Sequence, residues 1–353
     1  MMRSAYYETL SKKCNIEYLT MQTMEENNNP VYQKTRRRIL LTVFIVLIAM
    51  AAVNLWTSYQ VAVAGAHARY MGFKNVSSEK IAKIIRGAEM NATNIFDEVS
   101  KNLNDPEDVI SALKSKANLN IDVRGYFAAF EPNFFPEKGT WFEPYIYQPE
   151  HGGFDYRQVG SARHNYTKSP WYLRAKETGA SFWSEPYYYY DGTSLSGHYS
   201  TYVRPLYNAK GDLACVCGAD MKFEWIAKEL KWADESSRSN KLLNKYLWLA
   251  DLSYYTVILD SDGTCIAHPE EKEMAIKDET VIKDLKNRKS GVADLMIEGE
   301  TCTVFYGPIE YINWSVAVIV PKQGILKPLM PIAIVLLSMV VIGILIVWLV
   351  CKR

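Results

Sequence analysis

Two uninterrupted apolar runs dominate the pattern of hydrophobic and polar positions along the chain. Residues 39–56 and 329–350 contain no charged side chain, and charged residues flank both runs. Each run has about the 20 residues that a helix needs to cross a bilayer. A buried core helix would also be apolar, but the flanking charges favour a membrane span. The polar stretch before the first run argues against a cleaved signal peptide. We therefore predict transmembrane helices at residues 39–58 and 329–351.

Basic residues next to the two runs predict the orientation of the chain. They directly precede the first run and directly follow the second: Lys34, Arg36, Arg37, Arg38, Lys352 and Arg353. Positive charge at membrane boundaries favours the cytoplasmic side. We therefore expect residues 1–38 to form a cytoplasmic tail, and the whole segment between the two spans to lie outside the cytoplasm.

The segment that follows the first span has a helical period. Apolar residues recur at steps of three and four positions, which predicts a long helix over residues 59–103: Ile81, Ile84, Ile85, Ala88, Ala92, Ile95, Phe96 and Val99. Ser77 or Ser78 has the side chain of a helix N-cap and marks a possible start. Pro106 then permits a second, short helix over residues 107–117.

Strand patterns and turn residues fill the rest of the outer segment. A strand at 125–130 precedes two stretches rich in Pro and Gly, 132–147 and 149–161, which we interpret as loops. A short helix at 169–179 and an extended aromatic stretch at 182–190 follow. The remaining segments are expected to be a hairpin that turns at 208–211, an amphipathic helix at 222–237, and strands at 255–269 and 292–322 with turns at 298–299 and near 311–312. The predicted fold class is α+β, with a larger and a smaller sheet.

Composition excludes several classes of function. The formal net charge is +1, so a basic nucleic-acid-binding face is not expected. The chain has no G-x-S-x-G, phosphate-binding glycine-rich or zinc-ligand motif, and its histidines are isolated. We therefore predict no enzyme activity, no cofactor and no metal.

The cysteines leave one question open. Cys215 and Cys217 lie two positions apart in a predicted strand, so they share a face and cannot easily bridge each other. Cys265 and Cys302 both fall in strands of the smaller sheet. They are either free thiols or a disulfide, which an oxidising compartment would permit.

Several motifs in this order resemble the double Cache family of extracytoplasmic sensor domains. The stretches "SPWYLRAKETG", "SEPYYYYDG" and "YSTYVRPLYNAKGDLACVCGADM" look like its membrane-distal module. "YTVILDSDGTCIAHP" and "FYGPIEYINWSVAVIVP" look like its membrane-proximal module, and "SSEKIAKIIRGAEMNATNIFDEV" fits its stalk helix. The resemblance implies two PAS-like Cache modules, at 104–235 and 236–325, on a stalk helix at 59–103 between two transmembrane helices.

This resemblance also implies a place and a role. The protein would be a two-pass sensor of the bacterial inner membrane, a homodimer through its stalk helices, that binds a small molecule and signals to a cytoplasmic output. "GYFAAFEPNFFPEKGTWFEPY" and "FWSEPYYYYDG" resemble more narrowly the sensor half of bacterial membrane-bound SpoIIE-type serine/threonine phosphatases. In that family a HAMP linker and a phosphatase domain follow the second span, and neither is present in these 353 residues.

Family motifs carry over to individual pocket residues. The amino-acid-binding relatives have an Arg-x-Trp-Tyr stretch, a later Tyr-x-Asp and an aspartate that ends the last strand. The matching positions, which we take as candidate ligand-binding residues, are Trp171, Tyr172, Tyr187, Tyr189, Asp191 and Asp220. Tyr189 stands at the acidic position, and Ser169 stands at the arginine position.

Loss of that arginine changes the expected ligand. A guanidinium holds a carboxylate with two charge-assisted bonds, whereas a serine donates one. Arg174 or Arg163 could approach from another direction. The residues fit an amine, a sugar-like solute or a neutral aromatic ligand about equally, and an ordinary amino acid less well.

Plainer interpretations of the same residues stay open. In a strand, Tyr187 and Tyr189 face one way, while Tyr188 and Tyr190 face the other and would pack on the core or the stalk helix. Asp220 could instead cap the helix that follows it. The outer segment could also be an interaction module for an envelope protein, without a small-molecule ligand.

Overall fold

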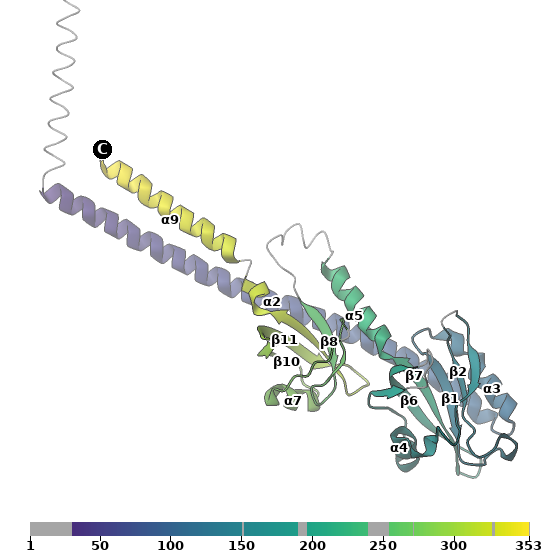
Figure 1. The fold of residues 1–353 in the computed structure, drawn as a ribbon. Helices are drawn as coiled ribbons and strands as arrows, with labels where there is room; N and C mark the ends of the chain where they lie inside the picture. Colours follow the sequence, from purple (N-terminus) through teal and green to yellow (C-terminus); the bar gives the residue numbers. More distant parts are fainter. Residues whose placement is uncertain are drawn as a thin grey trace, which may run out of the picture. The chain divides into compact units, whose positions relative to one another are not determined.

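The computed structural model describes residues 30–149, 152–189, 196–238, 254–270, 272–326 and 329–352. These residues form two compact units. One contains both β-sheets, and the other contains the apolar segments near the two ends of the chain. The boundaries fall after Ala66 and after Gly324. Figure 1 shows both units, and the helix α2 belongs to both because it runs without a break past the first boundary.

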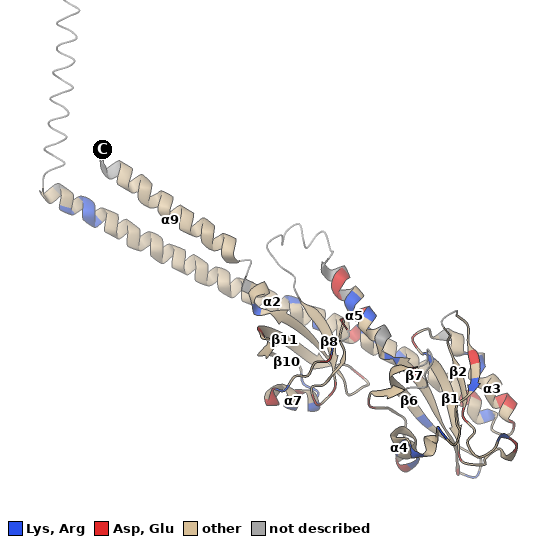
Figure 2. Ribbon diagram, viewed as in Figure 1, with Lys and Arg blue, Asp and Glu red and all other residues tan. Residues whose placement is uncertain are grey.

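Two helices of the described chain are long and apolar enough to cross a membrane. α2 (Pro30–Lys101) contains the first apolar run, and α9 (Leu329–Lys352) contains the second. Almost none of the side chains in the two apolar runs is buried within the protein. Figure 2 shows basic residues near the N-terminal end of α2, and α9 carries no charged residue before Lys352 at its C-terminal end. The predicted long N-terminal helix and apolar C-terminal helix are therefore both present.

α2 differs from the prediction in where it begins. It is one helix of 72 residues, so Ser77 and Ser78 lie in its middle, and the prediction that either one starts a helix is wrong. Ser77 is buried, and the Ser78 hydroxyl donates to the carbonyl of Pro308 at 2.7 Å. A serine inside a helix is compatible with this position because its hydroxyl bonds to a neighbouring strand instead of a helix end.

The first sheet has seven antiparallel strands in the order β3-β2-β1-β7-β6-β4, with β5 also paired to β6. Its elements and the helices around it are α3 (Pro106–Ser115), η1 (Ala117–Leu119), β1 (Gly125–Phe130), η2 (Pro136–Lys138), β2 (Pro144–Tyr147), β3 (Asp155–Gln158), η3 (Tyr166–Lys168), α4 (Pro170–Thr178), β4 (Phe182–Trp183), β5 (Tyr187–Tyr189), β6 (Gly197–Tyr207), β7 (Leu213–Lys222) and α5 (Phe223–Arg238).

Two of these strands were predicted as loops. β2 pairs with β1, with Ile146 opposite Tyr126, and β3 pairs with β2. β3 is an edge strand whose residues are mostly exposed, so it carries no alternation of apolar and polar positions. Pro and Gly in residues 132–161 favour loops, but pairing with the fully buried β1 makes β2 a strand, because β-propensity depends strongly on context.

The two faces of this sheet bury different side chains. One face packs against α2 and α3 and is apolar, and its central residues include Tyr126, Ile146 and Cys217. The other face forms a separate cluster with α4, which includes Phe127, Tyr145 and Val216. Successive residues of a strand point to opposite faces. Each strand therefore contributes alternately to the core beside α2 and to the face that α4 covers.

The second sheet has five antiparallel strands in the order β10-β11-β12-β8-β9. Its elements are β8 (Tyr255–Leu259), β9 (Cys265–Ala267), α7 (Glu279–Lys286), β10 (Gly291–Ile297), β11 (Glu300–Pro308), β12 (Ser315–Pro321) and α8 (Lys322–Leu326). Asp234 of α5 accepts hydrogen bonds at 2.8 Å from both the amide and the hydroxyl of Thr256, which ties α5 to β8.

The turns of the second sheet follow the predicted chemistry. Glu298 and Gly299, with φ of 49° and 84°, form the hairpin turn between β10 and β11, the backbone that two-residue hairpins prefer. Tyr311 also has a positive φ, of 69°, between β11 and β12. His268 Nδ1 accepts a hydrogen bond from the backbone amide of Glu270 at 3.1 Å, just after β9. The helix α7, which Asp278 caps, was not predicted.

The open question about cysteines has a geometric answer. Cys265 lies in β9 and Cys302 in β11, with β8 and β12 between them. Three strand spacings amount to about 14 Å, well beyond the reach of a disulfide. Both thiols are free. Cys215 and Cys217 share a face as predicted, and their thiols are free and form a hydrogen bond with the sulfur atoms 3.8 Å apart.

Candidate ligand pocket

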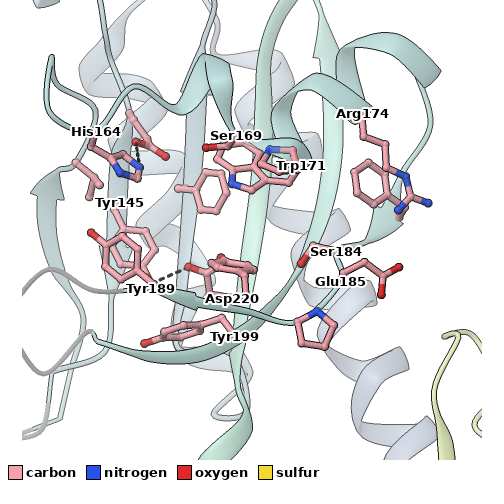
Figure 3. Close-up of a pocket in the computed structure, with 17 residues that line it drawn as sticks. Tyr145, His164, Ser169, Trp171, Arg174, Ser184, Glu185, Tyr189, Tyr199 and Asp220 are labelled. Atoms are coloured by element: carbon pink, nitrogen blue, oxygen red, sulfur yellow. Dashed lines mark hydrogen bonds and ion pairs between the residues drawn. The ribbon is translucent and has the colours of Figure 1, made fainter. Parts of the chain in front are cut away.

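A cavity of about 470 Å³ lies on the α4 side of the first sheet. α4, the segment before it, and β4 and β5 surround it, and the sheet closes its floor (Figure 3). Aromatic and carboxyl side chains dominate its lining: Phe127, Glu143, Tyr145, Val159, His164, Ser169, Pro170, Trp171, Arg174, Phe182, Ser184, Glu185, Pro186, Tyr187, Tyr189, Tyr199 and Asp220.

α4 presents one face to this cavity. Pro170 stands in its first turn, and Gly179 ends it with a φ of 64° and an amide that donates to the carbonyl of Ala175. This is the usual pairing of proline at a helix start and glycine just past its end. Trp171 lines the cavity, and its ring lies 5.1 Å from that of Phe127.

Tyr172, the next candidate, does not line the cavity. Adjacent residues of a helix point in directions about 100° apart, and Tyr172 turns into the protein, where it is 1% exposed. Its hydroxyl donates to Glu131 Oε1 at 2.8 Å. The structure thus places Tyr172 as a packing residue beneath the helix that carries Trp171.

Asp220 is the central polar residue of the cavity floor. It lies in β7, opposite Gly125 of β1 and Thr201 of β6. Its carboxylate accepts hydrogen bonds from Thr201 Oγ1 at 2.6 Å, from the Tyr145 hydroxyl at 3.0 Å and from the Tyr187 hydroxyl at 3.4 Å. These contacts commit the side chain to the cavity, so the alternative interpretation, in which Asp220 caps the following helix, does not hold.

Among the described residues, no cation pairs with the charge of Asp220. Burial raises the pKa of this carboxyl to about 6, although the hydrogen bonds from Thr201, Tyr145 and Tyr187 favour the ionised form and offset part of the effect. Of the described Lys, Arg and His side chains, none lies within ion-pair distance of it. At pH 7 the cavity therefore contains a mostly ionised, buried carboxylate, an arrangement that strongly favours a cation.

The tyrosines of β5 alternate as predicted, with one difference. Tyr187 and Tyr189 line the cavity. Tyr188 points the other way but does not pack on the core or on α2. It is 57% exposed, and its ring lies beside that of His198. β5 is at an edge of the sheet, so its outer face is open. Tyr190 and the candidate Asp191 lie outside the described residues.

Ser169 stands at the position of the family arginine, and Arg174 and Arg163 are the two arginines that could replace it. Ser169 lines the cavity, and its side chain makes no capping hydrogen bond to α4. Arg174 also lines the cavity, but it is exposed and its guanidinium stacks 4.0 Å from the ring centre of Phe182. Arg163 is exposed and is not part of the lining. Of these two arginines, Arg174 alone contributes to the lining of the cavity.

Sequence reasoning missed several polar residues of the cavity lining, among them Glu143 and His164. Glu143 directly precedes β2, two positions before Tyr145, so both side chains project to the same face. Glu143 is 3% exposed, and its Oε2 lies 3.5 Å from His164 Nε2. Residues 132–147 were predicted to be a loop. In a strand, residues 143, 145 and 147 share one face, and this alternation is the signal that could have identified Glu143.

Two glycines make room for the rings on the cavity floor. A Cβ on Gly125 would collide with the ring of Tyr145, and a Cβ on Gly218 would collide with the ring of Phe127. Neither glycine has a positive φ, so each is required here for close approach and not for an unusual backbone conformation.

Comparison with known proteins relates this fold to sensor domains. Residues 109–228, which span the first sheet from α3 to α5, match the sequence profile of the family described as "Methyl-accepting chemotaxis protein-like, first PDC sensor domain". No curated protein matches the chain in sequence.

Solved structures give the same result over more of the chain. The periplasmic sensory domain of the Campylobacter jejuni chemoreceptor Tlp1 is 14% identical, with a TM-score of 0.61 over 76% of this chain and 99% of that one. The fold is that of a PDC-type sensor domain.

Other structures with this sensor fold include ligand complexes. The extracellular domain of the proposed histidine kinase mmHK1S-Z3 is 20% identical, with a TM-score of 0.58 over 75% of this chain and 96% of that one. The ligand-binding domain of the Pseudomonas fluorescens chemoreceptor CtaA, solved with L-isoleucine, is 17% identical, with a TM-score of 0.51 over 76% and 98%.

Proposed function

We propose that the chain is the sensing part of a transmembrane receptor, which binds a small solute in the cavity beside Asp220 and passes the signal to a cytoplasmic output. The observation that carries this proposal is the carboxylate of Asp220, which is buried in a cavity with aromatic walls and has no cationic partner among the residues that the structure describes. Retaining such a group costs stability, and groups of this kind are concentrated at functional sites.

The same proposal includes the membrane topology. α2 and α9 would cross the inner membrane of a bacterium, with both ends of the chain in the cytoplasm and the two sheets outside it. Basic residues near the start of α2 and the exposure of both apolar runs support this orientation. The two sheets would correspond to two Cache modules, and two copies would pair through residues 59–101 of α2 as a homodimer.

No catalytic role is proposed for these residues. The described residues contain no group of three or more His, Cys, Asp or Glu side chains that could hold a metal ion. The output would be a separate domain or partner, a kinase or, as the narrower sequence resemblance implies, a phosphatase. Sensor domains of a histidine kinase and of chemoreceptors share this fold, which supports a signalling role but does not select among outputs.

Ligand binding can act on α2 only through different affinity for two states. One face of the first sheet forms the cavity floor and the other packs on α2. A solute that favours one packing of the sheet on α2 would therefore shift this helix, which is continuous with the first apolar run.

The test is a thermal-shift screen of the full chain in lipid nanodiscs against amines, amino acids, sugars and aromatic solutes. We expect at least one solute to raise the unfolding temperature. Trp171→Ala should abolish that shift, because its ring forms a wall of the cavity. Leu173→Ala is the control, since this residue is two positions away on the same helix and 51% exposed.

Two results would contradict the proposal. A full set of solutes that leaves the unfolding temperature unchanged would remove ligand sensing and favour the alternative of an envelope interaction module. A shift that survives Trp171→Ala would show that the solute binds elsewhere.

A further inference from the structure

One carboxyl oxygen in the cavity has no hydrogen-bond partner. Glu143 Oε2 is buried and makes no hydrogen bond within the described residues. This oxygen lies 3.5 Å from His164 Nε2, a distance longer than a normal N–H···O hydrogen bond. Almost all buried polar atoms in folded proteins are hydrogen-bonded, so an unpartnered oxygen that faces a cavity points to a missing group.

The protein holds Glu143 in place firmly. Its amide donates to Gln158 Oε1 at 3.3 Å, and its carbonyl accepts from the amide of Val159 at 3.0 Å. The side-chain NH₂ group of Gln158 in turn donates to the backbone carbonyls of Trp141 and Gly160. The position of the carboxyl therefore does not result from a loose loop. The neighbouring His164 is also placed, with its ring against that of Tyr189.

Burial favours the neutral form of both groups of this pair. Burial, and then the nearby charge of Asp220, raises the pKa of Glu143 far above its usual range. Burial lowers the pKa of His164. Both pKa shifts therefore favour a carboxylic acid beside an uncharged imidazole over an ion pair at this distance of 3.5 Å. Such a pair can donate and accept hydrogen bonds but offers little attraction to a full charge.

The cavity thus has two chemically different polar places. Asp220 offers a negative charge, and Glu143 with His164 offers uncharged donors and acceptors. Figure 3 shows His164 and Arg174 at opposite sides of the cavity, so the one arginine of the lining is not beside this pair. The rings of Trp171 and Phe127 supply apolar surface.

We propose that Glu143 and His164 form a second polar subsite, and that the ligand is a primary amine without a carboxylate, whose far end carries an uncharged hydroxyl or amide group. The inference rests on the proposed function, since it specifies the solute for the same cavity. The ammonium group binds Asp220, the apolar body lies against the rings, and the uncharged group completes the hydrogen bonding of Glu143 Oε2.

A carboxylate on the ligand is disfavoured for two reasons. It would add a negative charge to a cavity that already contains Asp220, and the serine at position 169 cannot clamp it as a guanidinium does. Arg174 stacks on Phe182 at the exposed edge, where solvent weakens its attraction to an anion.

Two matched sets of probes test this inference by calorimetry on the full chain in nanodiscs at pH 7.5. One set is tyramine, phenethylamine and tyrosine, and the other is ethanolamine, ethylamine and serine. In at least one set, we expect the hydroxyl-bearing amine to bind about tenfold more tightly than the amine without a hydroxyl, and more tightly still than the amino acid.

Variants separate the two subsites. Asp220→Asn should weaken every amine by at least about tenfold. Glu143→Leu should remove the preference for the hydroxyl and leave phenethylamine or ethylamine within about threefold, whereas Glu143→Gln, which stays uncharged and polar, should keep the preference. A purely structural Glu143 would change all probes alike. Glu137→Leu, at an exposed position, is the control.

Three outcomes would overturn the inference: tightest binding of an amino acid, no preference for the hydroxyl, or no amine binding in either set. A sugar or neutral aromatic solute that binds and loses affinity in Trp171→Ala would overturn the inference while the proposed sensing function stands. Absence of binding by any solute would contradict both.

Discussion

Asp220→Asn should stabilise the empty protein at neutral pH, although it should abolish binding of a cationic ligand. Asp220 is 8% exposed, and its three hydrogen-bond donors are neutral hydroxyls. An asparagine keeps an oxygen for Thr201, and the hydroxyls of Tyr145 and Tyr187 can rotate to accept from its NH₂ group. The substitution therefore removes the buried charge while most of the hydrogen bonding is kept.

The raised pKa sets the magnitude. Moving a carboxyl pKa from 3.8 to about 6 costs the ionised folded state about 3 kcal/mol. Because the folded pKa is higher than the unfolded one, the folded protein binds this proton more tightly between about pH 4 and 6. The free energy of unfolding consequently falls as pH rises through that window and then stays level.

Thermal unfolding of the ligand-free full chain between pH 4 and 8 measures the effect. At pH 7.5 we expect the Asn variant to be more stable by about 1 to 3 kcal/mol, an increase of several degrees in unfolding temperature for a domain of this size. At pH 4 the two proteins should be about equally stable. Asp155→Asn, an exposed carboxylate on β3 of the same sheet, is the control and should change neither value. An Asn variant that is less stable than the parent at pH 7.5, with the same pH profile, would refute the reasoning.

Three further outcomes follow from the same contacts. Amine affinity should fall about tenfold from pH 8 to pH 5 by calorimetry, since Asp220 with a pKa of about 6 is then mostly protonated; an affinity independent of pH would contradict this. Gly125→Ala should lower both ligand affinity and the free energy of unfolding, by about 1 to 3 kcal/mol for the latter, because the new Cβ displaces the ring of Tyr145. Trp183→Phe should cost about 1 kcal/mol in urea unfolding, because it leaves Glu89 without its indole donor, and Glu89→Leu in the same background should recover part of that loss.

Strong periodicity made most of the fold predictable. The all-apolar runs, the helical period of residues 81–99 and the turn at Glu298-Gly299 each carry a local signal, and the structure contains the corresponding elements. The segments that failed have weak local signals. β3 is exposed, and α7 has eight residues whose only cap signal is Asp278. Their structure depends on pairing with distant strands, which a local pattern does not report.

The candidate site divides in the same way. Trp171, Tyr187, Tyr189 and Asp220 line the cavity, and their positions came from motif order together with strand alternation. Tyr172 was grouped with Trp171 because the motif places the two side by side, but adjacent helical residues point in different directions.

Glu143 and His164 could not be found from the sequence for a different reason. Glu143 lies in a segment that was interpreted as a loop, and His164 lies in a segment to which no element was assigned. Only the folded β2 brings the Glu143 carboxyl into the cavity beside the imidazole of His164. Their charge state also depends on burial, which no sequence pattern reports at these two positions.

Strand alternation also connects the cavity to α2, because adjacent residues of one strand contact the cavity and the helix in turn. In β4 the cavity-lining Phe182 is followed by Trp183, whose indole nitrogen donates to Glu89 of α2 at 2.7 Å. In β6, Thr201 binds the Asp220 carboxylate, and the next residue, Tyr202, stacks on Phe96 of α2 with ring planes 8° apart.

A strand is too stiff for adjacent residues to move independently, and a packed core resists continuous deformation. Under the proposed function, a bound cation displaces Asp220 and its hydroxyl donors. The side chains that pack on α2 must then either move with them or oppose the displacement. A ligand shifts an equilibrium between two states only by its difference in affinity for them. The packing of Trp183 and Tyr202 on α2 opposes a shift of this helix. The free energy of that packing therefore sets how much of the binding energy is available to shift α2.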